Sequence, residues 1–257
     1  MIRMRHALAL SAVPLALAGG LVACGGDSGS GASASAPASE LPQGAEPVSL
    51  DPAEFTTTID NPWWPMAPGS KWVYRETDTE GGEQRVVVEV TGKTKRIANG
   101  VEAVVVRDTV TEDGEPVEVT DDWYAQDAAG NIWYLGEDTA EYEDGEVVSR
   151  SGSFEAGVDG AQPGIIMPAD PTAGMSYRQE YYEGEAEDRA EVVSVGDEQV
   201  EVPAGHYTDI VMTRDLVPLE PKIQELKMFA RGVGPVLAVG VSGGLGIEEL
   251  IEYAPGG

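Results

Sequence analysis

The chain has 257 residues, with 45 Asp or Glu against 16 Lys or Arg, so its formal net charge is −29 at pH 7. Such an acidic surface repels nucleic acid and anionic lipid headgroups, which argues against both as direct partners. A single cysteine and two histidines exclude an internal disulfide and a zinc or iron site built from several histidines.

The first two dozen residues have the pattern of a bacterial export signal. Arg3 and Arg5 precede the apolar stretch Ala7–Ala18, and small residues then lead to the only cysteine, Cys24. This pattern is typical of a cleavable secretory segment and not of a membrane span. The motif Leu21–Cys24 resembles the lipobox of bacterial lipoproteins, which implies that residues 1–23 are removed and that Cys24 carries a diacylglycerol thioether. The alternative is an ordinary secreted protein with a cysteine near its cleavage site by chance.

These features predict where the protein works. We expect a monomer at the extracytoplasmic face of the cell membrane, held there by the acyl chains on Cys24, because the acidic surface itself repels the membrane. Gly25–Pro47 is rich in Gly, Ser, Ala and Pro and has little to bury, so it is predicted to be a flexible tether. The expected organisation is a signal peptide (1–23), a lipidated cysteine with its tether (24–50) and one β-rich domain (51–257).

The stretch Asn61–Pro68 combines three prolines with two tryptophans. The prolines forbid regular structure while the tryptophans require burial. We expect an irregular segment that packs across the domain and closes one end of its core. The alternative is that Trp63 and Trp64 form a stacking platform for a ligand.

From Gly69 onward, short runs rich in Val, Tyr, Trp and Thr alternate with turn residues, and no stretch has a helical apolar period. An all-β fold with little helix is predicted. The expected strands of the first half are Lys71–Thr77, Arg85–Thr91, Val101–Thr111, Val117–Gln126 and Asn131–Gly136.

The second half repeats the first at an offset of about 105 residues. Three of the matching stretches are Gly69–Arg75 with Gly174–Arg178, Val105–Asp108 with Met212–Asp215, and Trp123–Ala125 with Met228–Ala230. The repeat predicts two antiparallel meanders (about 69–150 and 172–257) that form one curled sheet, half-barrel or barrel. Between them, Ser151–Pro171 carries an apolar tip, Ile165–Met167, which we expect to be an irregular plug or, alternatively, a mobile lid.

No pattern identifies a catalytic residue. His206 has no Gly-x-Ser-x-Gly partner motif and is expected to be structural or exposed. The many carboxylates leave two alternatives open: a buried acid pair for glycoside hydrolysis, or a calcium site near Glu137–Glu146, although no EF-hand spacing is present. We predict no metal site and no cofactor.

Arg107-Asp108 and Arg214-Asp215 recur at matching places on two long strands. Adjacent strand residues face opposite sides, so each repeat places one residue of the pair inward. A buried arginine would need a carboxylate from the protein or a ligand. The alternative is a set of cross-strand ion pairs on the outer face.

Two further motifs, Pro68–Tyr74 and Val202–Tyr207, resemble those of uncharacterised β-rich bacterial lipoproteins, and the expected shape is similar to the LolA and LolB lipoprotein carriers. That resemblance implies a sheet wrapped around an apolar cavity, and it carries no functional residue across. We therefore expect a non-catalytic, membrane-anchored protein that binds a lipid or small amphiphile, or an envelope partner. An anchored hydrolase and a purely structural envelope protein are the alternatives. The predicted ligand-lining residues are Trp72, Tyr74, Trp123, Trp133 and Met228.

Overall fold

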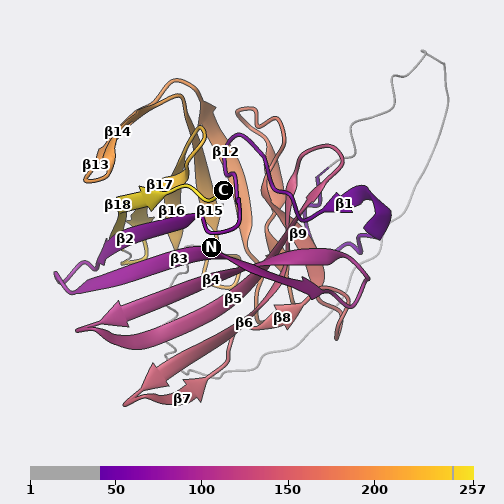
Figure 1. Ribbon diagram of the computed structural model, residues 1–257, viewed down its shortest axis with the longest axis horizontal. Helices are drawn as coiled ribbons and strands as arrows, with labels where there is room; N and C mark the ends of the chain where they lie inside the picture. The colour runs from indigo at the N-terminus through magenta and orange to yellow at the C-terminus, as the bar shows by residue number, and fades with distance from the viewer. Residues whose placement is uncertain (1–40, 245) are drawn as a thin grey trace, which may run out of the picture. The chain divides into compact units, whose positions relative to one another are not determined.

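The computed structural model describes residues 41–244 and 246–257 (Figure 1). The predicted signal peptide, the lipidated Cys24 and most of the predicted tether lie outside the described residues. Leu41–Gly257 belongs to one compact unit, which begins ten residues before the expected start at Asp51. The difference arises because the chain after Leu41 is bonded to the sheet: the Pro42 carbonyl accepts a hydrogen bond from the Arg178 amide at 2.6 Å.

The regular secondary structure of the described residues is almost entirely β-strand, with one short 3₁₀ turn, η1 (Pro52–Glu54). None of their helices is long and apolar enough to span a membrane. The strands are β1 (Phe55–Thr56), β2 (Lys71–Thr77), β3 (Glu83–Arg96), β4 (Glu102–Glu112), β5 (Glu115–Asp127), β6 (Ile132–Glu143), β7 (Glu146–Ser149), β8 (Phe154–Glu155), β9 (Gln162–Met167), β10 (Ser176–Arg178), β11 (Glu180–Tyr181), β12 (Arg189–Val195), β13 (Gln199–Val202), β14 (Gly205–Thr208), β15 (Ile210–Leu216), β16 (Gln224–Ala230), β17 (Gly234–Ser242) and β18 (Ile247–Ala254).

One large antiparallel sheet has the strand order β10-β12-β15-β16-β17-β18-β2-β3-β4-β5-β6-β9-β11 (Figure 1). The first meander is β2 to β6 and the second is β10, β12 and β15 to β17, each with its strands in chain order. β18 joins the two because it pairs with both β17 and β2. The predicted fold class, two repeated meanders in one curled sheet, is confirmed.

The two meanders begin with the same backbone arrangement. The amide of Gly69 donates to the carbonyl of Val90, and the amide of Gly174 donates to the carbonyl of Val192, both at 2.8 Å. The two glycines have nearly equal positive φ angles, 83° and 86°. A side chain at either position would be strained, so glycine is the residue that allows this turn into the first strand of each meander.

The sheet nearly closes into a barrel because its two ends are consecutive in the chain. β10 pairs with β12 at one end, and β11 pairs with β9 at the other. Only Gln179 separates β10 from β11. We call residues 176–181 the seam. At the seam Gly164 of β9 allows a close approach, since a Cβ there would lie 2.2 Å from the Gln179 carbonyl oxygen.

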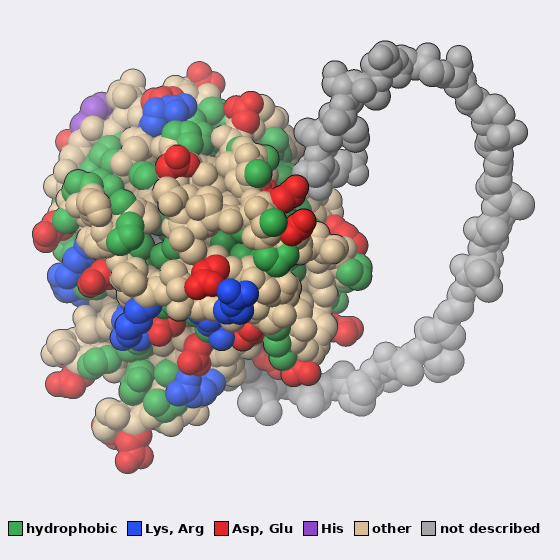
Figure 2. Space-filling model, turned by 45° about the vertical axis from the view of Figure 1, so that its right-hand side comes forward, with side chains coloured by type: hydrophobic (Ala, Val, Ile, Leu, Met, Phe, Trp, Pro, Cys, Tyr) green, Lys and Arg blue, Asp and Glu red, His purple; other side chains and the backbone are tan. Residues whose placement is uncertain are grey.

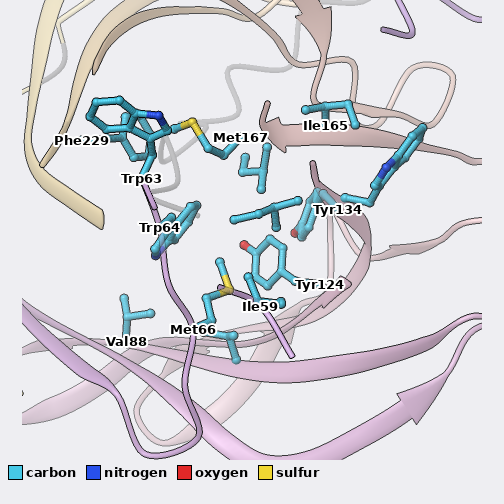
Figure 3. Packing of buried hydrophobic residues seen from close by; sticks show 14 of the residues in the cluster. Ile59, Trp63, Trp64, Met66, Val88, Tyr124, Tyr134, Ile165, Met167 and Phe229 are labelled. Atoms are coloured by element: carbon cyan, nitrogen blue, oxygen red, sulfur yellow. The ribbon is translucent and has the colours of Figure 1, made fainter. Parts of the chain in front are cut away.

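Aromatic side chains fill part of the interior (Figure 3). Trp64 packs against Tyr124 and Phe229 with ring centroids 5.8 Å and 5.9 Å away and interplanar angles of 52° and 53°. Tyr124 and Phe229 occupy matching places in the two repeats, so one tryptophan contacts both meanders in the same way. Asn61–Pro68 is irregular and buries Trp63, Trp64 and Met66, as the sequence indicated.

The connection between the meanders differs from the prediction. Ile165, Ile166 and Met167 are buried, but they belong to β9, which pairs with β6 and β11. The expectation of an irregular plug or lid was wrong. The glycines and prolines that suggested a loop flank a short strand, and Gly164 within it allows the close approach to the seam.

Candidate functional site

The predicted ligand-lining residues do not form one site. Trp72 and Tyr74 lie on the same, inward face of β2 and are almost fully buried. The Trp72 indole N–H donates to the Val233 carbonyl at 2.8 Å, and the Tyr74 hydroxyl donates to the Pro235 carbonyl at 3.0 Å. The polar atoms of both side chains therefore hold β2 against the backbone at the start of β17, through hydrogen bonds to Val233 and Pro235.

The other three predicted residues point elsewhere. Trp123 and Trp133 lie on the face of β5 and β6 opposite to Tyr124 and Tyr134, which stack on each other in the interior. Lys95 lies over the Trp123 ring at 4.2 Å, and the Trp133 indole N–H donates to Asp127 at 2.8 Å.

Met228 is also on the outward face. It is only partly buried and lies between Lys227 and Phe229, which face inward from β16. The inward-facing aromatics that the sequence analysis missed are Tyr124, Tyr134 and Phe229, each of them the immediate neighbour of a predicted residue. Neighbouring residues of a strand face opposite sides of the sheet, so a shift of one residue exchanges the two faces. On each of these strands the prediction chose the residue beside the one that faces inward.

Five charged side chains gather on the inward face of the sheet, and we call them the interior cluster. They are Asp108 on β4, Asp215 on β15, Glu225 and Lys227 on β16, and Glu248 on β18. Each is between 4% and 7% exposed. The cluster crosses the boundary between the two meanders, with two acids from strands that match in the repeat.

Lys227 is the ion-pair centre of the cluster. Its Nζ lies 2.7 Å from Asp215 Oδ2 and 3.3 Å from Glu225 Oε2. Asp215 also accepts hydrogen bonds from Thr213 at 2.9 Å and from Gln179 at 3.3 Å. Burial alone would lower the pKa of Lys227, but the two carboxylates outweigh it, so the pKa is raised and the side chain stays charged.

Glu248 of β18 is separated from Lys227 of β16 by the small residue Ala238 of β17. Ala238 of β17 is the cross-strand partner of both Lys227 and Glu248, so only a methyl group separates them on the inner face. Burial raises the pKa of Glu248 well above its usual value, and the nearby carboxylates of Asp108, Glu76 and Glu225 raise it further. Glu248 therefore holds a proton more readily than an exposed glutamate does.

The buried polar atoms at the cluster that have no hydrogen-bond partner among the described residues include Glu248 Oε1 and Tyr177 Oη. Tyr177 is fully buried, and burial followed by the negative charge of Asp215 raises the pKa of its hydroxyl. An unsatisfied buried polar atom costs about 1–3 kcal/mol. A ligand or water with complementary groups would remove that cost.

The paired Arg-Asp motifs place their aspartates, and not their arginines, inside the sheet. Arg107 forms a bidentate pair with Asp121 at 2.8 Å and 2.7 Å. Arg214 lies 3.5 Å from Glu191. Both are cross-strand pairs on the outer face, which was the alternative interpretation.

A second pair of buried acids lies on the first meander. Asp122 and Glu137 are cross-strand partners, each 1% exposed, and the Tyr134 hydroxyl contacts both, at 2.7 Å from Asp122. Gly136 has a φ of 126° beside a register shift, which brings Tyr134 and Glu137 to the same face although they are three residues apart. The carboxylates converge as an acid pair would, but with almost no exposed surface.

The other candidate metal-ligating and catalytic residues of the described chain do not gather at one place. Among the described residues, no group of three or more His, Cys, Asp or Glu side chains is placed to hold a metal ion. His206 is exposed on β14. Figure 2 shows acidic side chains scattered over the face it displays, with Lys and Arg among them. The interior cluster is thus the most concentrated set of buried charges in the described part of the chain.

Comparisons with known proteins give fold resemblances alone. No family model and no curated protein matches the chain. A presumed lipoprotein from Parabacteroides distasonis is 12% identical, with a TM-score of 0.41, over 75% of this chain and 98% of its own. A presumed exported protein with a YmcC-like fold from Bacteroides fragilis is 17% identical, with the same TM-score and coverage.

Proposed function

We propose that this protein is a membrane-tethered, extracytoplasmic binding domain without catalytic activity, and that its interior cluster takes the ammonium head of a small amphipathic amine. The tether and its location rest on the lipobox-like Leu21–Cys24. The ligand class rests on the cluster. The observation that carries it is the buried Glu248 carboxyl, whose Oε1 has no hydrogen-bond partner among the described residues.

The charge balance of the cluster favours a cationic ligand. The cluster has four carboxyl groups, on Asp108, Asp215, Glu225 and Glu248, against one lysine, the only lysine among the buried residues of the described chain. Buried acids are stabilised either by a proton or by a positive charge. A primary ammonium supplies that charge together with three N–H donors, so it complements the carboxylate acceptors of Glu248 and Glu225, whose charges already influence each other.

The surroundings suit an amphipathic molecule. Leu250 and Val236 are fully buried on β18 and β17, Leu250 two residues from Glu248 and Val236 two residues from Ala238. Tyr74, paired with Leu250 across the strands, adds an aromatic surface. An apolar chain attached to the ammonium would therefore meet apolar side chains beside the cluster.

The test uses the mature chain with Cys24→Ser, which removes the acyl anchor. Decylamine, decanol and decanoate are titrated at neutral pH, with binding followed by calorimetry and native mass spectrometry. We expect decylamine to bind and decanoate not to bind. Glu248→Gln should weaken decylamine binding by about tenfold or more, because it removes a charge-assisted hydrogen bond.

The matched control is Glu249→Gln. Glu249 is next in the chain but faces outward, where it pairs with Arg75 at 2.9 Å, so this variant should bind decylamine like the parent. Equal binding of all three probes would refute the ammonium specificity and retain an amphiphile-binding domain. Absence of binding by any probe would refute the ligand proposal and favour a protein partner or a structural role.

A second candidate, an anchored hydrolase, is favoured by one observation: the convergence of Asp122 and Glu137 on Tyr134. It requires that a glycoside substrate reach these side chains. Turnover of chromogenic glycosides that is abolished by Asp122→Asn would establish it. Unchanged background hydrolysis in both proteins would exclude it for those substrates.

A further inference from the structure

The first described residues run across the seam and are bonded to it. We call residues 41–46 the strap. The Gln43 side-chain amide donates to the Ser176 carbonyl at 2.6 Å, and the Ser176 hydroxyl bonds to the Gln43 amide oxygen at 3.0 Å. The Arg178 amide donates to the Pro42 carbonyl at 2.6 Å. The strap thus contacts β10 through both backbone and side-chain groups.

Arg178 joins three separate parts of the chain although it is only 1% exposed. From β10, its Nε and Nη2 donate to the Pro163 carbonyl of β9 at 3.1 Å and 2.8 Å. Its Nη1 donates to the strap, to the Gly44 carbonyl and to the Glu46 carbonyl at 3.0 Å. Removal of the strap would leave a buried positive charge without part of its hydrogen bonding, so the strap and Arg178 stabilise each other.

Glu46 holds the strap in its bonded shape. Its carboxylate accepts the amide of Gln43 at 2.5 Å and the amide of Gly44 at 2.8 Å. These two bonds close a turn that directs the carbonyls of Gly44 and Glu46 toward Arg178. The side chain of Glu46 is exposed, forms these two bonds within the strap, and adds a favourable charge near Arg178, so its removal loosens the strap from Arg178 while every strand residue is kept.

The seam lies next to the interior cluster. Tyr177 and Gln179 flank Arg178 in the chain, and both are buried. Gln179 donates to Asp215 of the cluster at 3.3 Å, and Tyr177 has the hydroxyl without a hydrogen-bond partner. Separation of β10 from β9 would therefore expose the side of the cluster formed by these residues.

We propose that the strap and Arg178 form a latch, and that release of the strap opens the seam and gives access to the interior cluster. The latch itself stands on the hydrogen bonds above; only the identity of what enters rests on the proposed function. The strap is the part of the predicted tether to Cys24 that lies nearest to the sheet domain in sequence. Tension or crowding at the membrane therefore acts on the latch before it acts on any other part of the described domain.

Hydrogen exchange of the mature Cys24→Ser chain tests the latch without any ligand. Glu46→Ala should increase exchange of seam and β9 amides by about tenfold or more, because it loosens the turn that presents carbonyls to the buried guanidinium. Amides of β3 and β4 should exchange as in the parent. The matched control is Glu54→Ala, an exposed acid in η1, which should leave the seam unchanged.

Two outcomes would overturn the latch: unchanged seam exchange in Glu46→Ala, or equal acceleration in every strand, which would mean that the seam does not open separately. Arg178→Lys is a second variant, since lysine cannot bridge β9 and the strap with a planar fork. If it remains folded, its seam should exchange faster still. Binding of decylamine is measured separately, so failure of the ligand proposal is distinguishable from failure of the latch.

Discussion

Glu248→Gln should change how the stability of the domain depends on pH. Glu248 is 4% exposed, and its pKa is raised first by burial and then by Asp108, Glu76 and Glu225. Burial likewise raises the pKa of Glu225, with Lys227 opposing the shift. Each carboxyl is thus more easily protonated in the folded domain than in the unfolded chain.

The sign of the effect follows from proton binding. An unfolded glutamate releases its proton at about pH 4.3, whereas the folded Glu248 keeps its proton to higher pH. Its contribution to stability is complete below the unfolded pKa and is lost as pH rises through the folded pKa. Over that window the free energy of unfolding falls by about 1.4 kcal/mol per pH unit for each such group.

Glutamine keeps the shape of a protonated glutamate and cannot ionise. The parent should therefore lose stability from about pH 5 upward, while Glu248→Gln loses less, so that the variant gains on the parent by up to about 1.4 kcal/mol per pH unit. Urea unfolding followed by tryptophan fluorescence between pH 5 and pH 8 measures both curves. Parallel curves for the two proteins would refute the raised pKa of Glu248.

Two further predictions concern individual contacts, and a third concerns the lipobox-like motif. Lys227→Met should destabilise the domain by about 3–5 kcal/mol in urea unfolding, because Asp215 and Glu225 lose their buried cation; Arg150→Met, which breaks an exposed pair with Asp138, should lose at most about 1 kcal/mol, and equal losses would contradict the argument. Trp64→Ala should cost about 3–5 kcal/mol, since it removes the ring between Tyr124 and Phe229; a loss below about 1 kcal/mol would show that the ring does not join the meanders. Cys24→Ala should abolish incorporation of labelled palmitate and release the protein from membranes, and retained label would exclude lipidation at this residue.

Much of the fold could be predicted from local patterns. The expected strand Lys71–Thr77 is β2 with the same bounds. The repeat predicted two meanders because each copy keeps its turns and strands in the same order, and Gly69 and Gly174 confirm one such equivalence in detail. β9 could not be predicted in this way, because its short apolar run is flanked by the same Gly and Pro residues that mark loops.

Which side chains of a strand face the interior was harder to predict. Trp123-Tyr124 and Trp133-Tyr134 are runs in which both faces carry aromatic side chains, so alternation gives no signal for which residue points inward. The register shift near Gly136 then resets the alternation within β6. The backbone of Phe154 approaches this position closely, since its carbonyl oxygen would lie 2.2 Å from a Cβ of residue 136.

The interior cluster was predicted only in part. Asp108 and Asp215 were singled out because they recur in the repeat. Glu225, Lys227 and Glu248 carried no comparable signal, since charged residues are mostly exposed and these three meet only when β16, β17 and β18 pair. Alternation of Glu225, Lys227 and Phe229 along one strand was the available clue, because it places two charges on the face of an aromatic residue.

A crystal structure of the Cys24→Ser chain with decylamine at neutral pH tests the central claim most directly. We expect the amine nitrogen within hydrogen-bond distance of Glu248 Oε1, with the alkyl chain against Leu250 and Val236. Decylamine bound only on the outer surface, or an interior cluster occupied by water alone at saturating decylamine, would contradict it.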